Sequence, residues 1–360
     1  MTPGAEAYVV GVDSGGSGLR VALGTVDAAV PAATTVCPEP VRTGSDGIDA
    51  DHLLGQLLPA IERLTRDVTG ARASGGGVRV AALAVGAAGM ATLGDDLRAR
   101  LPGSLAASLG ARLLALAADG VTAYAGALGQ RPGAVVAGGT GMIALGTDLG
   151  TWRRADGWGH LLGDSGGGAW IGREGLDAAL RAHDGRRGGS HALLARLRAV
   201  FGPAAGLPAL LYPRDDRPAL LASFAPEVAA CAEEDAVAGS ILRRAAAHIA
   251  ESAAAVCPRA EGSGTRERTT ESGTRERTTG SGGEAAEVAL TGGLFRMGDP
   301  LLGPLREELG RLLPNASLVP AAGDPLAGSL LIARALARSD LRLPRHPTLL
   351  HVVGDGLGGS

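Results

Sequence analysis

Two glycine-rich turns, at residues 13–17 and 138–141, each separate a pair of apolar segments and have the composition of a phosphate-binding loop. Their glycines leave backbone N–H groups open to an anion, and Ser17 and Thr140 add a hydroxyl group to each turn. Taken alone, either turn could simply connect two strands. A third glycine pair, Gly292 and Gly293, follows another apolar segment. The three turns together favour loops that hold one nucleotide.

Two aspartates stand at the ends of apolar segments, where a carboxylate has to face something polar. Asp13 closes the segment at residues 8–13 and is predicted to orient a hydrated Mg²⁺ on the nucleotide; alternatively, it caps its own turn. Asp119 follows the apolar segment 113–117 and precedes a predicted helix. That position makes Asp119 a candidate general base, with an N-cap residue as the alternative.

The segment 156–173 holds two of the three tryptophans in a chain with only 2% aromatic residues. Trp158 and His160 lie close to Asp164 in sequence and are separated by glycines, so the three side chains could stack on a sugar and hydrogen-bond to it. Trp170 opens the next predicted helix and is expected to pack inside the protein. His160 alone could equally be a structural histidine in a loop.

The order of the predicted elements repeats along the chain. Strands at 8–13 and 19–26 form a hairpin, and a helix at 50–68, a strand at 78–85, a helix at 95–109 and a strand at 113–117 follow. After a helix at 120–128, a second hairpin (134–137 with 142–146) opens a second half. We therefore predict two α/β lobes, residues 1–115 and 116–360, with a cleft between them for chemistry.

The second half contains a long helical region and a polar insert. Residues 174–256 are predicted to be mostly helical, and a strand at 287–290, a helix at 299–313, a strand at 316–319 and a helix at 325–337 follow. The insert at about 260–284 repeats SGTRERTT at 263–270 and 272–279. Because the repeat has no apolar residue to bury, a disordered loop is expected there.

The composition excludes several classes of protein. All 34 basic residues are arginines, which rules out a Walker-type P-loop and a Schiff-base lysine. The net charge is −3 with no basic stripe, so nucleic acid is not an expected partner. The sequence shows neither a signal-like segment nor an apolar run of about 18 residues, so no membrane partner and a cytoplasmic location are expected. The three cysteines (Cys37, Cys231 and Cys257) have no metal-site or disulfide spacing.

Over residues 8–337, apart from the insert, the chain resembles the N-acetylglucosamine kinases and the BadF/BadG/BcrA/BcrD-type ATPases of the actin/hexokinase-like superfamily. The similarity is strongest in GTG at 139–141 followed by GWGHLLGD at 157–164, which resemble that family's second phosphate loop and sugar loop. Residues 11–17 are similar to its first phosphate loop, and residues 290–293 to its adenosine-side loop. The resemblance implies an α/β fold of two duplicated actin-like, ribonuclease H-like lobes around a nucleotide and sugar cleft.

The resemblance also implies an ATP-dependent kinase that phosphorylates an amino sugar, foremost N-acetylglucosamine at carbon 6. Asp119 occupies the position of the general base, ATP and Mg²⁺ are the implied cofactors, and a homodimer is the implied assembly. The implied binding residues are Gly15, Gly16, Ser17, Thr140, Gly141, Gly292 and Gly293 for ATP, Trp158, Gly159, His160 and Asp164 for the sugar, and Asp13 for Mg²⁺.

Three places depart from the family's pattern, one of them the region 43–46, which lacks the Asn expected to contact the sugar's hydroxyl groups. Met142 stands where the family usually has Ser, and Ser165 where it usually has Glu, so an acid that could contact the sugar is missing. The acceptor therefore stays open among N-acetylglucosamine, glucosamine, an N-acetylmuramic acid derivative and another hexose. Two further functions on the same fold are an ATPase that activates a radical dehydratase and a sugar sensor without turnover. The first of these needs cysteines beside the nucleotide loops to hold an iron–sulfur cluster.

Overall fold

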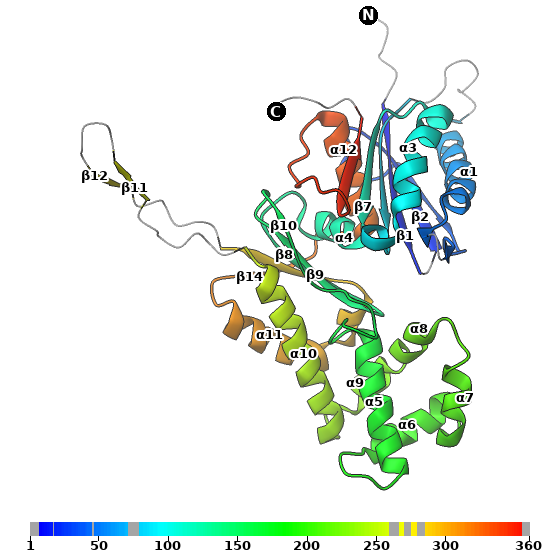
Figure 1. Cartoon of the computed structure of the whole chain (residues 1–360), viewed down its shortest axis with the longest axis vertical. Coiled ribbons are helices and arrows are strands. Elements are labelled where there is room, and N and C mark those ends of the chain that lie inside the picture. The colour runs from blue at the N-terminus through cyan, green and yellow to red at the C-terminus, as the bar shows by residue number, and fades with distance from the viewer. Residues whose placement is uncertain are drawn as a thin grey trace, which may run out of the picture.

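Two β-sheets with matching strand order form the frame of the molecule (Figure 1). The structure, a computed structural model, describes residues 7–16, 18–44, 47–70, 79–258, 266–269, 275–278 and 285–354. The first sheet has the order β15-β7-β6-β1-β2-β3. Its strands are β1 (Tyr8–Gly15), β2 (Gly18–Thr25), β3 (Ala33–Cys37), β6 (Val80–Ala87), β7 (Leu113–Ala118) and β15 (Leu350–Val353).

The second sheet repeats this arrangement with the order β10-β9-β8-β13-β14. In both sheets an antiparallel three-stranded meander continues into two parallel strands. The duplication predicted from the sequence is therefore confirmed. The strands of the second sheet are β8 (Gly133–Gly138), β9 (Met142–Thr147), β10 (Trp152–Asp156), β13 (Glu287–Thr291) and β14 (Ser317–Pro320).

The helices of the first lobe follow from apolar periodicity and capping. In α1 (Ala50–Thr69) buried Ala, Leu and Ile residues recur every three or four positions, and the Asp49 side chain caps the helix by accepting from the His52 N–H. Helices α1 and α3 (Asp95–Leu109) cover one face of the sheet, and α12 (Pro325–Arg338) covers the other (Figure 1). The short elements α2 (Met90–Leu93), β4 (Thr43–Gly44) and β5 (Gly47–Ile48) complete this lobe.

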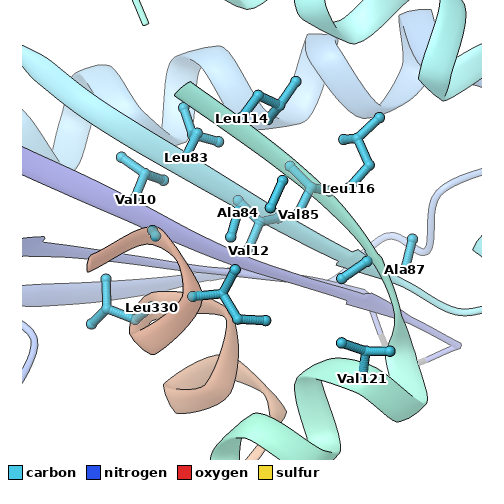
Figure 2. Close-up of a cluster of buried hydrophobic side chains, with 14 of the residues drawn as sticks. Val10, Val12, Leu83, Ala84, Val85, Ala87, Leu114, Leu116, Val121 and Leu330 are labelled. Carbon is cyan, nitrogen blue, oxygen red and sulfur yellow. The ribbon is translucent and has the colours of Figure 1, made fainter. Parts of the chain in front are cut away.

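Helix α4 (Asp119–Leu128) passes from the first sheet to the second and packs against α12. Figure 2 shows Val121 of α4 and Leu330 of α12 against the buried side chains of β1, β6 and β7. The two helix backbones approach so closely that a Cβ atom on Gly328 would lie 1.9 Å from the Thr122 carbonyl oxygen. Only glycine fits at this point of contact.

The second lobe is mostly helical outside its sheet, as the sequence predicts. Helix α10 (Ala236–Val256) packs on the second sheet beside α11 (Asp299–Leu312). Within the described residues no single helix is long and apolar enough to cross a membrane; by length and composition, one pair bent by 61°, His191–Phe201 with Ala204–Leu211, meets that criterion. The remaining helices are α5 (Gly168–His183), α6 (His191–Phe201), α7 (Leu207–Leu211), α8 (Arg217–Ala222) and α9 (Ala225–Cys231), with 3₁₀ turns η2 (Ala204–Gly206) and η3 (Gly293–Met297).

The last part of the chain does not lie in the lobe to which the predicted boundary at residue 115 assigns it. Helix α12 packs on the first sheet and β15 pairs with β7, so residues 325–354 lie with the first lobe although the sequence assigns them to the second. The indole N–H of Trp152 donates to the Pro344 carbonyl oxygen at 2.7 Å and ties this tail to β10. These contacts join residues that are far apart in sequence, which local periodicity does not encode.

The polar insert also differs from expectation where the structure describes it. Strands β11 (Arg266–Thr269) and β12 (Arg275–Thr278) pair antiparallel, in place of the expected disordered loop. The rest of the insert lies outside the described residues.

The close contact of α4 and α12 is testable by adding one methyl group. We expect Gly328→Ala to lower the free energy of unfolding by about 1–3 kcal/mol, because the new Cβ must displace backbone. In Gly55→Ala, the matched control on α1, the Cβ would meet no atom within 4 Å. This control should gain about 0.5–1 kcal/mol from helix propensity. Urea unfolding followed by circular dichroism measures both, and equal shifts for the two variants would contradict the packing argument.

Candidate active site

A cleft of about 640 Å³ lies between the lobes. The first lobe contributes residues that follow β6 and β7, and the second contributes the β8–β9 turn and the loops after β10 and β13. The cleft therefore joins most of the segments that the sequence singles out. Its lining includes Gly89, Thr92, Asp119, Gly138, Thr140, Gly141, Met142, Arg154, Trp158, Gly159, Asp164, Gly292, Gly293 and Leu349.

Three glycine-containing loops of the second lobe meet at this cleft. Gly292, at a φ of 103°, lies so close to the β8–β9 turn that a Cβ would come within 2.1 Å of the Gly138 carbonyl oxygen. A Cβ on Gly141 would lie 2.3 Å from Oδ2 of Asp164. The predicted phosphate loop therefore contacts the predicted adenosine-side loop on one side and the predicted sugar loop on the other.

Two carboxylates fix the shape of the loop after β10. Asp156 accepts hydrogen bonds from the backbone N–H groups of Asp164 at 2.6 Å and Ser165 at 2.9 Å. Asp164 in turn accepts from the Gly159 N–H at 3.0 Å. Asp156 and Asp164 have φ angles of 59° and 54°, in the left-handed region that Asp tolerates better than most residues. These bonds present Trp158, Gly159 and Asp164 to the cleft as one unit.

Arg154 holds the same loop from β10. Its Nε donates to the Asp156 carbonyl oxygen at 3.0 Å and its Nη2 donates to the Gly157 carbonyl oxygen. The guanidinium carbon lies 4.6 Å from the ring centroid of Trp158, which is a cation–π contact. Arg154 is not among the residues that the sequence singled out. An arginine four residues before a tryptophan in a glycine-rich loop was the available signal.

The exposed tip of this loop separates the predicted sugar residues. Trp158 is 66% exposed and lines the cleft, whereas His160 is half-buried and lies outside the lining.

Burial, opposed by the Gly159 hydrogen bond, raises the pKa of Asp164 above its usual value. Trp170 packs edge-to-face against His248 at 5.3 Å, in agreement with its predicted packing role.

Asp119 lies at the first residue of α4, after the cap residue Ala118, so it is not the N-cap. Its carboxylate accepts a hydrogen bond from the Gly120 N–H at 2.8 Å. Burial raises its pKa above the usual value, the Gly120 hydrogen bond opposes this shift, and the nearby charge of Asp13 adds to it. A half-buried carboxylate with a raised pKa on a rigid helix suits a general base.

The first hairpin brings Asp13 close enough to Asp119 for their charges to interact, but neither Asp13 nor the hairpin tip lines the cleft. Asp13 pairs in register with Gly86 of β6, and its Oδ2 accepts from Arg20. Gly15 and Gly16 lie beyond the last β1–β6 pair and do not line the cleft. Ser17 lies outside the described residues. The metal role of Asp13 and the phosphate role of this tip therefore stay predictions.

Comparison with known sequences decides the family. The sequence model of the BadF/BadG/BcrA/BcrD ATPase family matches residues 10–326. The chain belongs to this family. A curated relative, the N-acetylmuramic acid/N-acetylglucosamine kinase of Clostridium acetobutylicum, is 28% identical over 181 residues. That match covers 50% of this chain and 55% of the relative, so the chain spans about half the length of the curated relative it matches.

Solved structures support the two-lobe fold of this BadF/BadG/BcrA/BcrD ATPase family member. A Chromobacterium violaceum protein assigned as an N-acetylglucosamine kinase is 28% identical, with a TM-score of 0.64, and the match covers 91% of this chain and 99% of that one. A Porphyromonas gingivalis protein with the same assignment is 18% identical, with a TM-score of 0.60 over 89% and 97% of the chains. A ROK family glucokinase from Streptomyces griseus, with a TM-score of 0.51 at 18% identity over 92% and 100% of the chains, shares the fold.

The buried charge of Asp119 predicts a stability change that depends on pH. Since the folded-state pKa is raised, the ionised carboxylate destabilises the fold above that pKa, and this penalty is lost as the pH falls below the unfolded-state value. Asp119→Asn should therefore melt at a higher temperature than the wild type at pH 8, with a difference that narrows toward pH 4. The control is Asp67→Asn, an exposed site on α1. Identical melting temperatures of Asp119→Asn and the wild type at pH 8 would refute the burial argument.

Proposed function

We propose that the chain transfers the γ-phosphoryl group of ATP to a hydroxyl of an amino sugar, with N-acetylglucosamine as the acceptor and its 6-phosphate as the product. The observation that carries this proposal is the position of Asp119. Its half-buried carboxylate lines the same cleft as Thr140, Gly141 and the sugar loop. A base, a phosphate loop and an aromatic platform in one cleft are what phosphoryl transfer to a sugar needs.

Asp119 acts as the general base in this proposal. It accepts the proton of the sugar hydroxyl while that oxygen forms a bond to the γ-phosphorus, and the bond from this phosphorus to the oxygen bridging the β- and γ-phosphates breaks to release ADP. The raised pKa of Asp119 brings its basicity closer to neutral pH than that of an ordinary aspartate. Because α4 is almost entirely buried, the carboxylate is held in place without reorganisation.

The nucleotide contacts are assigned to the glycine loops of both lobes. Gly139 and Thr140 are exposed in the β8–β9 turn, so this turn suits phosphate oxygens, and the loop after β13 suits the adenosine. The tip of the first hairpin would complete the phosphate site from the other lobe. The residues assigned to the nucleotide are Gly15, Gly16, Ser17, Thr140, Gly141, Gly292 and Gly293.

The sugar is assigned to the loop that Asp156 and Arg154 hold. Trp158 offers an exposed ring face, and Gly159 and Asp164 offer polar groups on the same side of the cleft. His160, in the same loop, is also assigned to the sugar. The names of the Clostridium and Chromobacterium relatives support an N-acetylated amino sugar as the acceptor.

The carboxylate of Asp13 is suited to a magnesium ion that is already bound to the nucleotide. Such an ion keeps most of its water ligands and needs only one or two carboxylates, and bound Mg²⁺ neutralises phosphate charge. Asp13 supplies one carboxylate, 15% exposed, at the end of β1. Among the described residues, no group of three or more His, Cys, Asp and Glu side chains could form a larger metal cage. The homodimer and the cytoplasmic location stay predictions.

A coupled assay of ADP release tests the proposal. With Mg²⁺ and ATP, release should require a sugar, and N-acetylglucosamine should exceed glucosamine, N-acetylmuramic acid and glucose. Asp119→Asn should lower the rate by about 10²–10⁴-fold, the usual contribution of a general base, whereas Asp67→Asn should keep it. The 6-deoxy analogue of N-acetylglucosamine should not be phosphorylated.

Three results would replace the proposal. ADP release that is the same with and without every sugar would indicate an ATPase. Sugar binding without ADP release would indicate a sensor. Phosphorylation of the 6-deoxy analogue would move the reacting hydroxyl away from carbon 6.

A further inference from the structure

Arg20 lies between two carboxylates at the edge of the site and has no role in the reaction described so far. It stands on β2 directly opposite Asp13 of β1 in the antiparallel register, so the two side chains share one face of the sheet. Its Nε and Nη2 donate to Asp13 Oδ2 at 2.9 and 2.6 Å. Its Nη1 donates to Oδ2 of Asp324 at 2.5 Å.

The two carboxylates that Arg20 joins differ in their surroundings. The Asp13 side chain is 15% exposed and that of Asp324 is 52% exposed, with Arg20 between them at 34%. Asp13 is the carboxylate assigned to the metal ion. A guanidinium bound to one of its oxygens by two hydrogen bonds and a dication therefore compete for the same negative charge.

Asp324 is a fixed anchor. It is the N-cap of α12, and its Oδ1 accepts from the Ala327 N–H at 2.9 Å. Its backbone lies against α4, since a Cβ on Gly126 would come within 2.1 Å of the Asp324 carbonyl oxygen. Burial acts against its charged form, yet the hydrogen bonds from Ala327 and Arg20 outweigh it and hold the pKa of Asp324 below its usual value. Arg20 can thus stay bound to Asp324 when it releases Asp13.

We propose that Arg20 is a positioning residue that controls access of the metal ion to Asp13, with Asp324 as the second anchor that retains the guanidinium when the metal binds. The inference rests on the proposed function, because it takes Asp13 as the metal-orienting carboxylate. In the absence of metal, Arg20 neutralises Asp13 beside Asp119. When the nucleotide-bound metal arrives, Asp13 exchanges the guanidinium for the ion, and no charge is left unpaired at the end of β1.

A titration with Mn²⁺ tests the proposed role of Arg20 without any sugar or turnover. The full-length protein with ADP is titrated with Mn²⁺, and the free ion is measured by electron paramagnetic resonance. Arg20→Gln should bind Mn²⁺ about three- to tenfold more tightly, because a partly exposed competing ion pair is gone. Asp324→Asn should bind it more weakly by a similar factor, because Arg20 loses its second anchor. Arg100→Gln, which removes an exposed charge paired with Asp51, should leave the affinity unchanged.

The double variant separates this mechanism from a general effect of net charge. If Asp324 acts only through Arg20, then Asp324→Asn should change nothing in the Arg20→Gln background. If the two substitutions act only as local charges, their effects will add. Additive effects, or an unchanged affinity in Arg20→Gln, would overturn the inference.

A further variant distinguishes this failure from failure of the proposed function. Asp13→Asn should weaken Mn²⁺ binding. If it does so while Arg20→Gln has no effect, the metal role of Asp13 stands and the inference about Arg20 falls. If Asp13→Asn leaves the affinity unchanged, the assigned metal role of Asp13 itself is wrong. Thermal melting of each variant confirms that the fold is retained.

Discussion

The close contact between α4 and α12 is the constraint on which the rest of the structure depends. The chain passes between the lobes through these two helices, and their backbones touch at Gly328 and at Gly126. Such an approach requires side chains no larger than hydrogen at the crossing points, which explains why this part of the chain is rich in glycine and alanine. Because α4 packs on both sheets and α12 packs on the first sheet and on α4, the residues at the N-terminal ends of both helices have defined positions at the junction of the lobes.

Because the two lobes are duplicated, the N-terminal ends of α4 and α12 occupy equivalent positions, but the aspartates at these ends differ in their chemistry. Asp119 follows β7 at the start of α4, and Asp324 precedes α12 after β14, the strand that corresponds to β7. Asp119 turns toward the cleft, and burial raises its pKa. Asp324 caps its helix and binds Arg20, and its pKa is lowered. One architectural position therefore supplies a candidate base in one lobe and a structural anchor in the other.

The sequence predicts the elements well because each depends on local periodicity. The hairpin at β8–β9 and the amphipathic α1 have the predicted type, and their bounds differ from the predicted bounds by at most one residue. The position of Asp119 at the end of a strand could also be predicted, because the apolar segment before it is visible in the sequence. Most of what the sequence did not reveal is long-range, and Arg154, which contacts its own loop, is the local exception. Strand β15 is defined by its pairing with β7, and the bond from Arg20 to Asp324 joins residues 304 positions apart.

The absence of lysine determines how positive charge is used in this cleft. A guanidinium stays ionised at any physiological pH and offers donors in a planar fork, so Arg20 can bind two carboxylates at once and Arg154 can bind two carbonyl groups while covering Trp158. A lysine ammonium, as a compact point charge, would not reproduce either geometry. Arginine cannot take part in proton transfer at neutral pH. In the proposed reaction, proton transfer is therefore assigned to a carboxylate. Both cleft carboxylates with a raised pKa accept a backbone hydrogen bond, but Asp164 accepts from Gly159 and closes its own loop, whereas Asp119 accepts from Gly120, the next residue of α4.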